Sequence, residues 1–447
     1  MQQTLFYIPS DLFGLPVFGV GLALAALFIG VAVAAARRFS RTKKFDEEIG
    51  SFLGLLAVGG AVLVFIAPNV LEPQGFPIRG YGTFLLFAIL AALGWVLLLA
   101  KQRGINADTV FSLCLWSVVS GLLGARLFYI TEYWQDTFVF DPVGNLLFRE
   151  TFFNIVNIAR GGLVVYGSII GGMAGAIIFM RRNRLPILST LDFMAPALML
   201  GIAIGRLGCL MNGCCFGGVC EWPWAITFPE GSPAHAHQVI KGETFYDGLK
   251  FEDKRSGEDV FVVVREVQPN SNAEQAGLRP GMMLKGISGM VDGRPQGWLV
   301  RSAVGAFEVI YDLRRADPQG NLRFDVYIGG DQKTEKSFFV APTPVVVLPV
   351  HPTQIYSSFG AACICGVLFF LGRLSFFRRR SGLVFAAFLF LYSAGRFYIE
   401  TLRVDEGSFL GTGLTVSQNI CIFVFLTAVV LGTIVLRKRN SVPPAKA

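Results

Sequence analysis

Residues 191–207 read LDFMAPALMLGIAIGRL, and the chain continues as GCLMNGCCFG through 208–217. No side chain between 193 and 204 carries a charge, so this run predicts a helix that spans a bilayer. An arginine at the edge of such a helix is costly unless it meets a ligand or a partner. Arg206 is therefore the first candidate for a residue that binds an anion at a membrane surface.

The composition predicts a polytopic α-helical membrane protein. Hydrophobic residues make up 53% of the chain, charged residues only 16%, and the mean hydropathy is +0.55. These values lie far from those of soluble globular proteins. We expect about nine transmembrane helices, each close to the length that crosses a bilayer. They are predicted at 17–35, 52–67, 81–99, 110–129, 162–180, 191–207, 353–371, 383–398 and 415–436.

Basic residues gather in every second loop between these predicted spans, as the positive-inside rule requires. The net charge of +8 therefore reflects membrane orientation, and we expect no nucleic acid partner. The clusters lie at 37–44, 101–103, 181–184, 373–380 and 437–439. This alternation predicts an N-terminus outside the membrane and a C-terminus in the cytoplasm.

Residues 232–344 are polar, mixed in charge and free of predicted spans. Strands are predicted at 260–267 and 322–328, and a helix at 301–314. Residues 267–287, VQPNSNAEQAGLRPGMMLKGI, resemble the middle of a PDZ domain. Met282 stands where that family usually has an aspartate, and no Gly-Leu-Gly-Phe-like loop precedes it. We therefore predict a small α+β PDZ-like insert; a small α+β insert that only packs on the membrane core is the alternative.

Four cysteines crowd into one segment, Cys209, Cys214, Cys215 and Cys220. Their spacing is not a usual zinc-ligand pattern, so we expect no metal. Free or packed thiols and a disulfide both remain open, because the predicted side of the membrane is oxidising.

Polar and charged residues recur where the predicted spans reach the exterior surface. On a helix, Arg396, Glu400 and Arg403 share one face. Guanidinium groups match phosphate oxygens in bidentate geometry. We therefore predict a site for the phosphate headgroup of a membrane lipid. The candidate substrate-binding residues are Tyr81, Arg126, Gly162, Gly167, Arg206, Asn212, Gly217, His351, Gln354, Arg396, Glu400 and Arg403.

Simpler roles exist for several of these residues. Arg126 and Arg403 also fit interfacial arginines whose charged ends reach water. Glu400 could only neutralise a neighbouring arginine, and His351 could only mark the entry of a helix before Pro352. A purely interfacial role is less favoured for Arg206, because glycines surround it and let a ligand or helix approach closely.

The motifs at 160–167, 205–217, 351–356 and 395–403 look like those of bacterial prolipoprotein diacylglyceryl transferases, and 223–229 resembles that family's exterior head. The resemblance covers roughly 76–435, interrupted by the insert. It implies transfer of the diacylglyceryl group of phosphatidylglycerol to the lipobox cysteine of prolipoproteins, with release of glycerol 1-phosphate. No cofactor is implied. The implied location is the bacterial cytoplasmic (inner) membrane, among membrane lipids.

By this resemblance, Arg206 and Arg396 bind phosphate and stabilise the leaving charge, and Tyr166 is the third catalytic candidate. Tyr166 stands where many members have a histidine, and a tyrosine is a poor base because its reference pKa is about 10. We expect its hydroxyl to orient the phosphate instead. Cys209 and Cys214 also replace an asparagine and a glutamate that are common in the family.

The predicted organisation has four parts. Two additional transmembrane helices occupy 1–75, the first part of the transferase core 76–231, the PDZ-like insert 232–344, and the last three helices 345–447. A catalytically altered sensor that binds lipid and peptide is the alternative function. A transporter should place charges deeper in the spans and show a second opening, and neither is seen in the sequence.

Overall fold

The computed structural model describes residues 76–437 except 142–144, 157–163, 257–258, 292, 329–333 and 405–411, and short pieces of the first 75 residues. The chain divides into two compact units. The helical unit comprises 4–205, 361–393 and 423–447, and the head unit comprises 206–360 and 394–422 with the first three residues. The predicted spans at 17–35 and 52–67 fall mostly outside the described residues.

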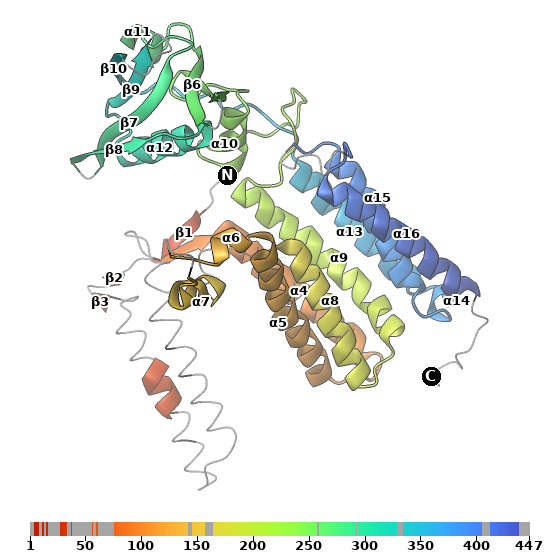
Figure 1. Cartoon of the computed structure of the whole chain (residues 1–447). Helices are drawn as coiled ribbons and strands as arrows, with labels where there is room; N and C mark the ends of the chain where they lie inside the picture. Colours follow the sequence, from red (N-terminus) through yellow and green to blue (C-terminus); the bar gives the residue numbers. More distant parts are fainter. Residues whose placement is uncertain are drawn as a thin grey trace. The chain divides into compact units, whose positions relative to one another are not determined.

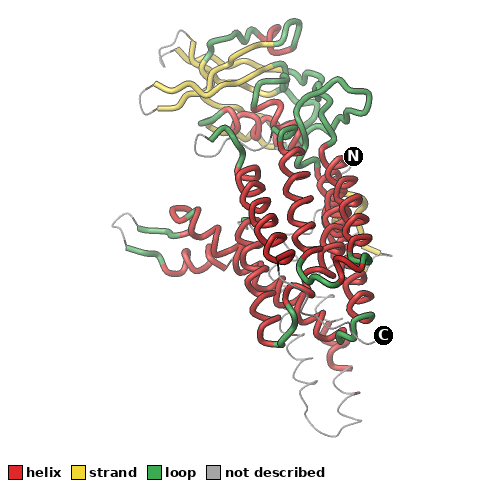
Figure 2. Tube along the Cα trace, turned by 90° about the vertical axis from the view of Figure 1, so that its right-hand side faces the viewer, coloured by secondary structure: helices red, strands yellow, loops and turns green. Residues whose placement is uncertain are grey.

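Long apolar helices dominate the helical unit (Figures 1 and 2). Among the described residues, six helices are long and apolar enough to cross a membrane, which makes the chain a polytopic membrane protein. They are α4 (Gly80–Lys101), α5 (Ala107–Glu132), α9 (Ile187–Asn212), α13 (Thr353–Leu371), α15 (Leu383–Glu400) and α16 (Val416–Arg437). A further helix, α8 (Val165–Arg182), lies where a span was predicted and ends on two arginines.

Shorter elements complete this unit. Strand β1 (Thr4–Ile8) pairs with β4 (Phe76–Arg79) in antiparallel register, directly before α4 begins. The remaining short elements are β2 (Asp11–Leu12), β3 (Leu15–Pro16), α6 (Trp134–Thr137), α7 (Phe148–Val156) and α14 (Ser375–Arg378). The Asn106 side chain accepts from the Asp108 amide at 3.2 Å and so caps the start of α5.

Helices α5 and α8 lie side by side because small residues face each other along their contact (Figure 1). A Cβ added to Gly167 would lie 2.4 Å from the Gly124 carbonyl oxygen. A Cβ added to Gly171 would lie 2.4 Å from the Ser120 carbonyl oxygen. These distances leave no room for a methyl group, so only glycine permits the two backbones to approach this closely.

Asp192, in the second turn of α9, links that helix to the start of α15. Its carboxylate oxygens accept from the Gly382 amide at 2.6 Å and from the Phe385 amide at 2.8 Å. The first amides of a helix have no partner within it, and an acidic side chain there is also favoured by the helix dipole. The carboxylate thus satisfies donors that would otherwise be left bare at the helix end.

We expect Gly171→Ala to lower the free energy of unfolding by about 1–3 kcal/mol, because the new methyl group must force α5 and α8 apart. Thermal unfolding in detergent micelles measures the change. Gly94→Ala is the matched control, since a Cβ at Gly94 meets no atom within 4 Å and also lies in an apolar helix. Equal melting temperatures for the two variants would contradict this account of the contact.

The head unit is built on a six-stranded sheet with the order β10-β9-β7-β6-β5, and β8 pairs with β7 off this path. All of its pairings are antiparallel. The predicted strands at 260–267 and 322–328 and the predicted helix at 301–314 are present. The elements are α10 (Pro233–Ile240), β5 (Leu249–Ser256), β6 (Asp259–Val267), α11 (Asn272–Ala276), β7 (Met283–Val291), β8 (Arg294–Leu299), α12 (Ala303–Ala316), β9 (Leu322–Ile328) and β10 (Thr334–Val340).

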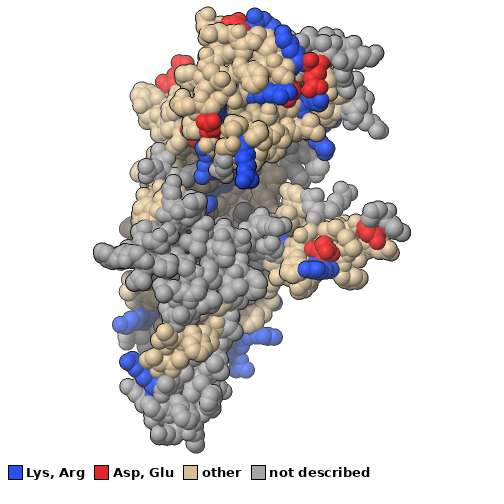
Figure 3. Space-filling view, turned by 90° about the vertical axis from the view of Figure 1, so that its left-hand side faces the viewer, with Lys and Arg blue, Asp and Glu red and all other residues tan. Residues whose placement is uncertain are grey.

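The core of this part lies between the sheet and α12. Ile287, Ile310 and Phe324 are fully or almost fully buried there. Ser271 and Ser302 accept from backbone amides of the first turns of α11 and α12 and so begin these helices. In the face seen in Figure 3, charges of both signs are scattered over this sheet, whereas the described helix surfaces are mostly uncharged.

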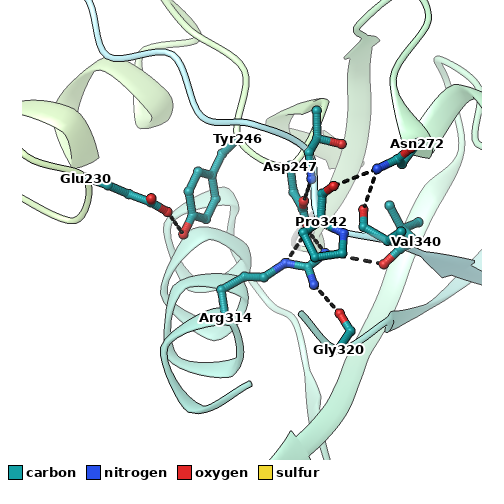
Figure 4. A network of polar contacts seen from close by, with 10 residues as sticks. Glu230, Tyr246, Asp247, Asn272, Arg314, Gly320, Val340 and Pro342 are labelled. Carbon is teal, nitrogen blue, oxygen red and sulfur yellow. Dashed lines mark hydrogen bonds and ion pairs between the residues drawn. The ribbon is translucent and has the colours of Figure 1, made fainter. Parts of the chain in front are cut away.

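A buried ion pair ties the entry of the sheet to its exit (Figure 4). Arg314, on α12, pairs with Asp247, which lies just before β5 and is 3% exposed. The same guanidinium donates to the carbonyl oxygens of Gly320 and Val340. The second Asp247 oxygen accepts from the Thr343 amide at 2.9 Å. The chain that enters at 247 and the chain that leaves at 343 are therefore held together through one carboxylate.

Replacing Arg314 with methionine should strand the Asp247 carboxylate in a buried position, at a cost of about 3–5 kcal/mol. We expect faster amide hydrogen exchange across 244–340 in the purified full-length chain. Arg315→Met changes the neighbouring exposed arginine and should leave exchange unaltered. Unchanged protection in the Arg314 variant would show that the ion pair does not hold the sheet closed.

Candidate functional site

Three of the sequence motifs meet in the head unit through backbone hydrogen bonds. Gly213, with φ of +74°, ends α9 in the left-handed region that favours glycine. The segment that follows pairs with two distant stretches. The Gly217 amide donates to the His351 carbonyl at 3.0 Å, the His351 amide donates to the Gly218 carbonyl at 3.0 Å, and the Gly218 amide donates to the Leu402 carbonyl at 3.0 Å. The motifs at 205–217, 351–356 and 395–403 are thus neighbours.

Gly217 occupies the tightest point of this junction. A Cβ there would lie 2.6 Å from the His351 Cβ and 2.9 Å from both the Leu402 carbonyl oxygen and the Thr353 Cγ2. Such distances exclude any side chain. The structure therefore gives Gly217 a reason to be glycine that comes from the backbone junction itself.

Side chains at the start of α13 hold the loop after α9. The Thr353 hydroxyl donates to the Cys215 carbonyl at 2.6 Å, and the Gln354 side-chain amide donates to the Cys214 carbonyl at 2.7 Å. Gln354 is fully buried. Among the described residues, its Oε1 has no hydrogen-bond donor, and the buried Nδ1 of His351 likewise has no partner. Both atoms lie beside the junction and are available to a polar ligand.

Glu400 forms a charged cluster with Arg396 and Arg403, and its side chain is 0% exposed. Its carboxylate pairs with Arg396 at 2.8 Å and with Arg403 at 3.5 Å. Helix α15 ends at Glu400, so the predicted shared helix face holds for Arg396 and Glu400 but not for Arg403, which follows the helix and pairs with Gly217 in a β-bridge. The Thr415 hydroxyl donates to the same carboxylate at 3.4 Å. One buried negative charge thus serves two arginines, which leaves a net positive charge.

The Arg396 guanidinium is only partly used by these contacts. Its Nη2 donates to the Ser417 hydroxyl at 3.2 Å. Its Nη1 is buried and has no hydrogen-bond partner within the described part of the chain. A buried donor without an acceptor is costly, so an anion placed against Nη1 would gain a strong, charge-assisted hydrogen bond.

Arg206 belongs to the same cluster. It forms no hydrogen bond or ion pair with the residues that the structure describes. The Cys215 thiol connects it to the others electrostatically. Hydrogen bonds from Cys209 and Cys214 lower the pKa of Cys215, and Arg403 and Arg206 lower it further. Positive charge from both arginines therefore reaches one sulfur atom.

The cysteine segment contains free thiols rather than a disulfide. The sulfur atoms of Cys209, Cys214 and Cys215 lie within 4.8 Å of one another. They could offer three ligands to a soft cation, but structural zinc usually takes four protein ligands. Among the described residues, no fourth His, Cys, Asp or Glu joins this group. Asn212, half-buried at the end of α9, interacts with the Cys214 thiol.

The other predicted site residues belong to the helical unit. Tyr81 is 42% exposed at the start of α4, and Tyr166 is half-buried at the start of α8. The Arg126 guanidinium donates to the Ile155 carbonyl at 2.8 Å and to the Asn154 carbonyl, so it caps the end of α7. Their substrate-binding roles stay predictions.

Two of the predicted glycines have different outcomes. Gly167 faces Gly124 in the contact between α5 and α8, which gives it a packing role. Gly162 lies outside the described residues. The substrate-binding roles predicted for both therefore stay predictions.

Two residues of the cluster escaped the sequence analysis, Thr415 and Ser417. Both precede or begin α16, which is otherwise strongly apolar. Polar residues recur here as TVSQN at 415–419, and such a run at the entrance of an apolar helix was the available indication. This run contains no charged residue, so the sequence analysis did not select it as it selected the arginines.

A Glu400→Gln change should leave Arg396 and Arg403 with buried, unneutralised charge and destabilise the protein by about 3 kcal/mol. Phosphate should then raise the melting temperature of the variant more than that of the unchanged protein, at matched ionic strength. Glu132→Gln, at the exposed end of α5, is the control. If phosphate raises both melting temperatures equally, the arginines do not form an anion site.

The chain is similar to known proteins of one family. Residues 68–434 match the family described as "Prolipoprotein diacylglyceryl transferase". The chain is 33% identical to a Rhodopirellula baltica protein named "Phosphatidylglycerol--prolipoprotein diacylglyceryl transferase", over 98% of this chain and 90% of that protein. A protein of the same name from Synechocystis sp. is 32% identical over 36% of this chain and 53% of its own length. A Clostridium perfringens protein named "Phosphatidylglycerol--prolipoprotein diacylglyceryl transferase 2" is 36% identical over 37% of this chain and 60% of its own length.

Proposed function

The chain belongs to the prolipoprotein diacylglyceryl transferase family, and we propose that it transfers the diacylglyceryl group of phosphatidylglycerol to the lipobox cysteine of a prolipoprotein. The single observation that carries the proposal is the Arg396 guanidinium: its Nη1 is buried and has no hydrogen-bond partner among the described residues, and it belongs to a cluster with net positive charge. A phosphate group is the ligand that such an edge fits.

The reaction is a substitution at a glycerol carbon. The cysteine sulfur forms the new C–S bond of a thioether while the C–O bond to the phosphate breaks. The electron pair of that bond leaves with glycerol 1-phosphate, and the thiol proton passes to the leaving phosphate or to a nearby base. Negative charge grows on the phosphate oxygen as the bond breaks, so fixed cations next to it lower the barrier.

In this proposal Arg206 and Arg396 bind the phosphate and stabilise its growing charge. Glu400 holds Arg396 and Arg403 in place through their ion pairs. Gln354 and His351 contribute the polar atoms that lie beside the junction. Asn212 and Gly217 shape the headgroup site, together with Tyr81, Arg126, Gly162 and Gly167.

Tyr166 is proposed to orient the phosphate through its hydroxyl. A tyrosine is a weak base at neutral pH, since its reference pKa is about 10. The thiol proton therefore goes elsewhere in this scheme, with the leaving phosphate as the nearest acceptor. The motivation is its position at the start of α8, within the motif at 160–167.

We further propose that the protein lies in a bacterial inner membrane with about nine spans, its N-terminus outside and its C-terminus in the cytoplasm. The basic loops motivate this orientation. Residues 232–344 would then form a PDZ-like module on the exterior side. Among the described strands, its edge strand β5 pairs with β6 alone, and an edge of this kind can add a strand from an extended peptide. A segment of the prolipoprotein is the peptide that the reaction supplies.

The direct test is incubation of the purified protein with phosphatidylglycerol and a lipobox peptide, followed by mass spectrometry of the peptide. The expected product carries one diacylglyceryl group on its cysteine, and a peptide with serine at that position should stay unmodified. If the cysteine peptide also stays unmodified, the chain is a lipid- or peptide-binding sensor of the same fold.

Arg396→Lys should lower kcat/KM about 100-fold or more, because a point charge cannot replace a planar fork at a developing oxyanion. Arg379→Lys, an exposed arginine after α14, is the matched control and should keep full activity. Full activity in the Arg396 variant would show that bidentate contact with the phosphate is not needed.

A further inference from the structure

A cavity of about 520 Å³ lies within the helical unit, at the ends of helices that carry the basic loops. None of its lining residues is among those assigned to the transfer site. Its size falls in the range of small-molecule sites. It is lined by Trp95, Leu98, Leu99, Gln102, Arg103, Asp192, Phe193, Pro196, Leu368, Phe369, Gly372, Arg373 and Arg378. We call it the arginine cavity.

Three arginines from separate elements line the arginine cavity. The Arg103 guanidinium lies over the Phe193 ring at 4.7 Å, and the Arg373 guanidinium lies over the Phe369 ring at 4.2 Å. Such stacking fixes the planes of both groups and leaves their N–H edges for other partners. Arg378 is close enough to Arg103 for the two charges to repel.

The carboxylate in the arginine cavity does not balance these charges. Asp192 attracts Arg103 electrostatically, but both of its oxygens accept from backbone amides at the start of α15. Within the described part of the chain, Arg103, Arg373 and Arg378 form no ion pair with any carboxylate. Three cations against one shared anion leave a net positive charge that favours an anionic ligand.

Trp95 adds a hydrogen-bond donor further from the helix end than the arginines. Its indole N–H is buried and has no acceptor among the described residues. Trp95, on α4, lies seven residues before Gln102, the residue that follows this helix, so it is about 10 Å further from the helix end on the same face. Leu98 and Leu99 lie between these levels, and Leu98 is 66% exposed along the apolar helix surface.

These features order the arginine cavity from charged to apolar. Guanidinium groups stand at the helix ends, and a single hydrogen-bond donor and leucines follow toward the middle of the helix. A glycerophospholipid has the same order, with a phosphate, then ester carbonyls, then acyl chains. We propose that the arginine cavity binds the headgroup of an anionic glycerophospholipid, with the phosphate on Arg103 and Arg373 and an ester carbonyl on the Trp95 indole. The lipid comes from the leaflet beside which the basic loops lie.

The test is a titration of the delipidated, detergent-solubilised full-length protein with dioleoyl phosphatidic acid, followed by native mass spectrometry. The double change Arg103→Gln and Arg373→Gln should remove one tightly bound lipid and weaken its binding about 100-fold, roughly tenfold for each lost charge-assisted contact. Trp95→Phe should weaken it about fivefold. The titration is repeated with the Arg396→Lys chain, so that a lipid bound in the head unit is distinguished from the lipid bound in the arginine cavity.

The matched control is the double change Arg181→Gln and Arg182→Gln at the end of α8, which removes the same charge outside the arginine cavity. Its lipid binding should stay within about twofold of the unchanged protein, because a screened surface charge contributes little. Equal losses in both double variants would mean non-specific attraction to basic helix ends and would overturn the proposal.

Two further ligands separate the source of the phosphate. Dioleoylglycerol, which lacks the phosphate, should not occupy the arginine cavity, and inorganic phosphate should displace the lipid only at far higher concentration. Binding of dioleoylglycerol as tight as that of phosphatidic acid would refute phosphate recognition. Displacement by inorganic phosphate at equal concentration would reassign the cavity to a soluble anion.

A second pair of changes, Arg103→Lys with Arg373→Lys, is measured in case the glutamine pair fails to fold. It keeps the charges and should retain part of the affinity for the lipid. Unweakened lipid binding in either pair would overturn the proposal.

Discussion

The buried carboxylate of Glu400 is the constraint on which the charged part of the head unit depends. Burying one ion is expensive, and burying three is affordable only when their partners and hydrogen bonds are arranged together. Glu400 provides that arrangement for Arg396 and Arg403, while Thr415 and Ser417 add hydroxyl groups. Among the described residues, the pairing leaves one positive charge unneutralised and the Nη1 of Arg396 without an acceptor, and an anion can use both. A site that binds phosphate and later releases it needs such a remainder, since fully paired arginines would have nothing to offer a ligand.

The charges of the arginine cavity, at the basic helix ends of the helical unit, are incompletely balanced in a similar way. Asp192 satisfies the amides at the start of α15 and so gives only part of its charge to Arg103. In both places an acidic residue also holds the structure, and the arginines nearby carry more positive charge than it can neutralise. The two places differ in what surrounds them. The Glu400 cluster is closed by backbone pairing at Gly217, whereas the arginine cavity is bordered by apolar side chains such as Leu98 and Trp95.

Glycine serves two different purposes in this chain, and only the structure separates them. From the sequence, Gly167 and Gly217 are both predicted to bind substrate. At Gly217 the neighbours are the His351 side chain and the Leu402 carbonyl, so the residue closes a junction of three chain segments. At Gly167 the neighbour is the Gly124 carbonyl, so the residue allows two helices to pack. Arg126 is a similar case. The sequence predicts that it binds substrate, and the structure adds a contact that the sequence did not predict, because its guanidinium caps α7.

The sequence by itself determined the properties that are local along the chain. Apolar runs long enough for a bilayer, basic loops, strand periodicity at 260–267 and 322–328, and the i, i+4 placement of Arg396 and Glu400 all follow from neighbouring residues. Tertiary structure alone decided the contacts between distant segments: Gly217 with His351 and Leu402, Arg396 with Ser417, Arg314 with Asp247, and the Trp95 ring with Phe369. The physical reason is that periodicity and hydropathy fix which face of an element is apolar, whereas the identity of the atom across from it depends on how helices and strands pack, which no single stretch of sequence specifies.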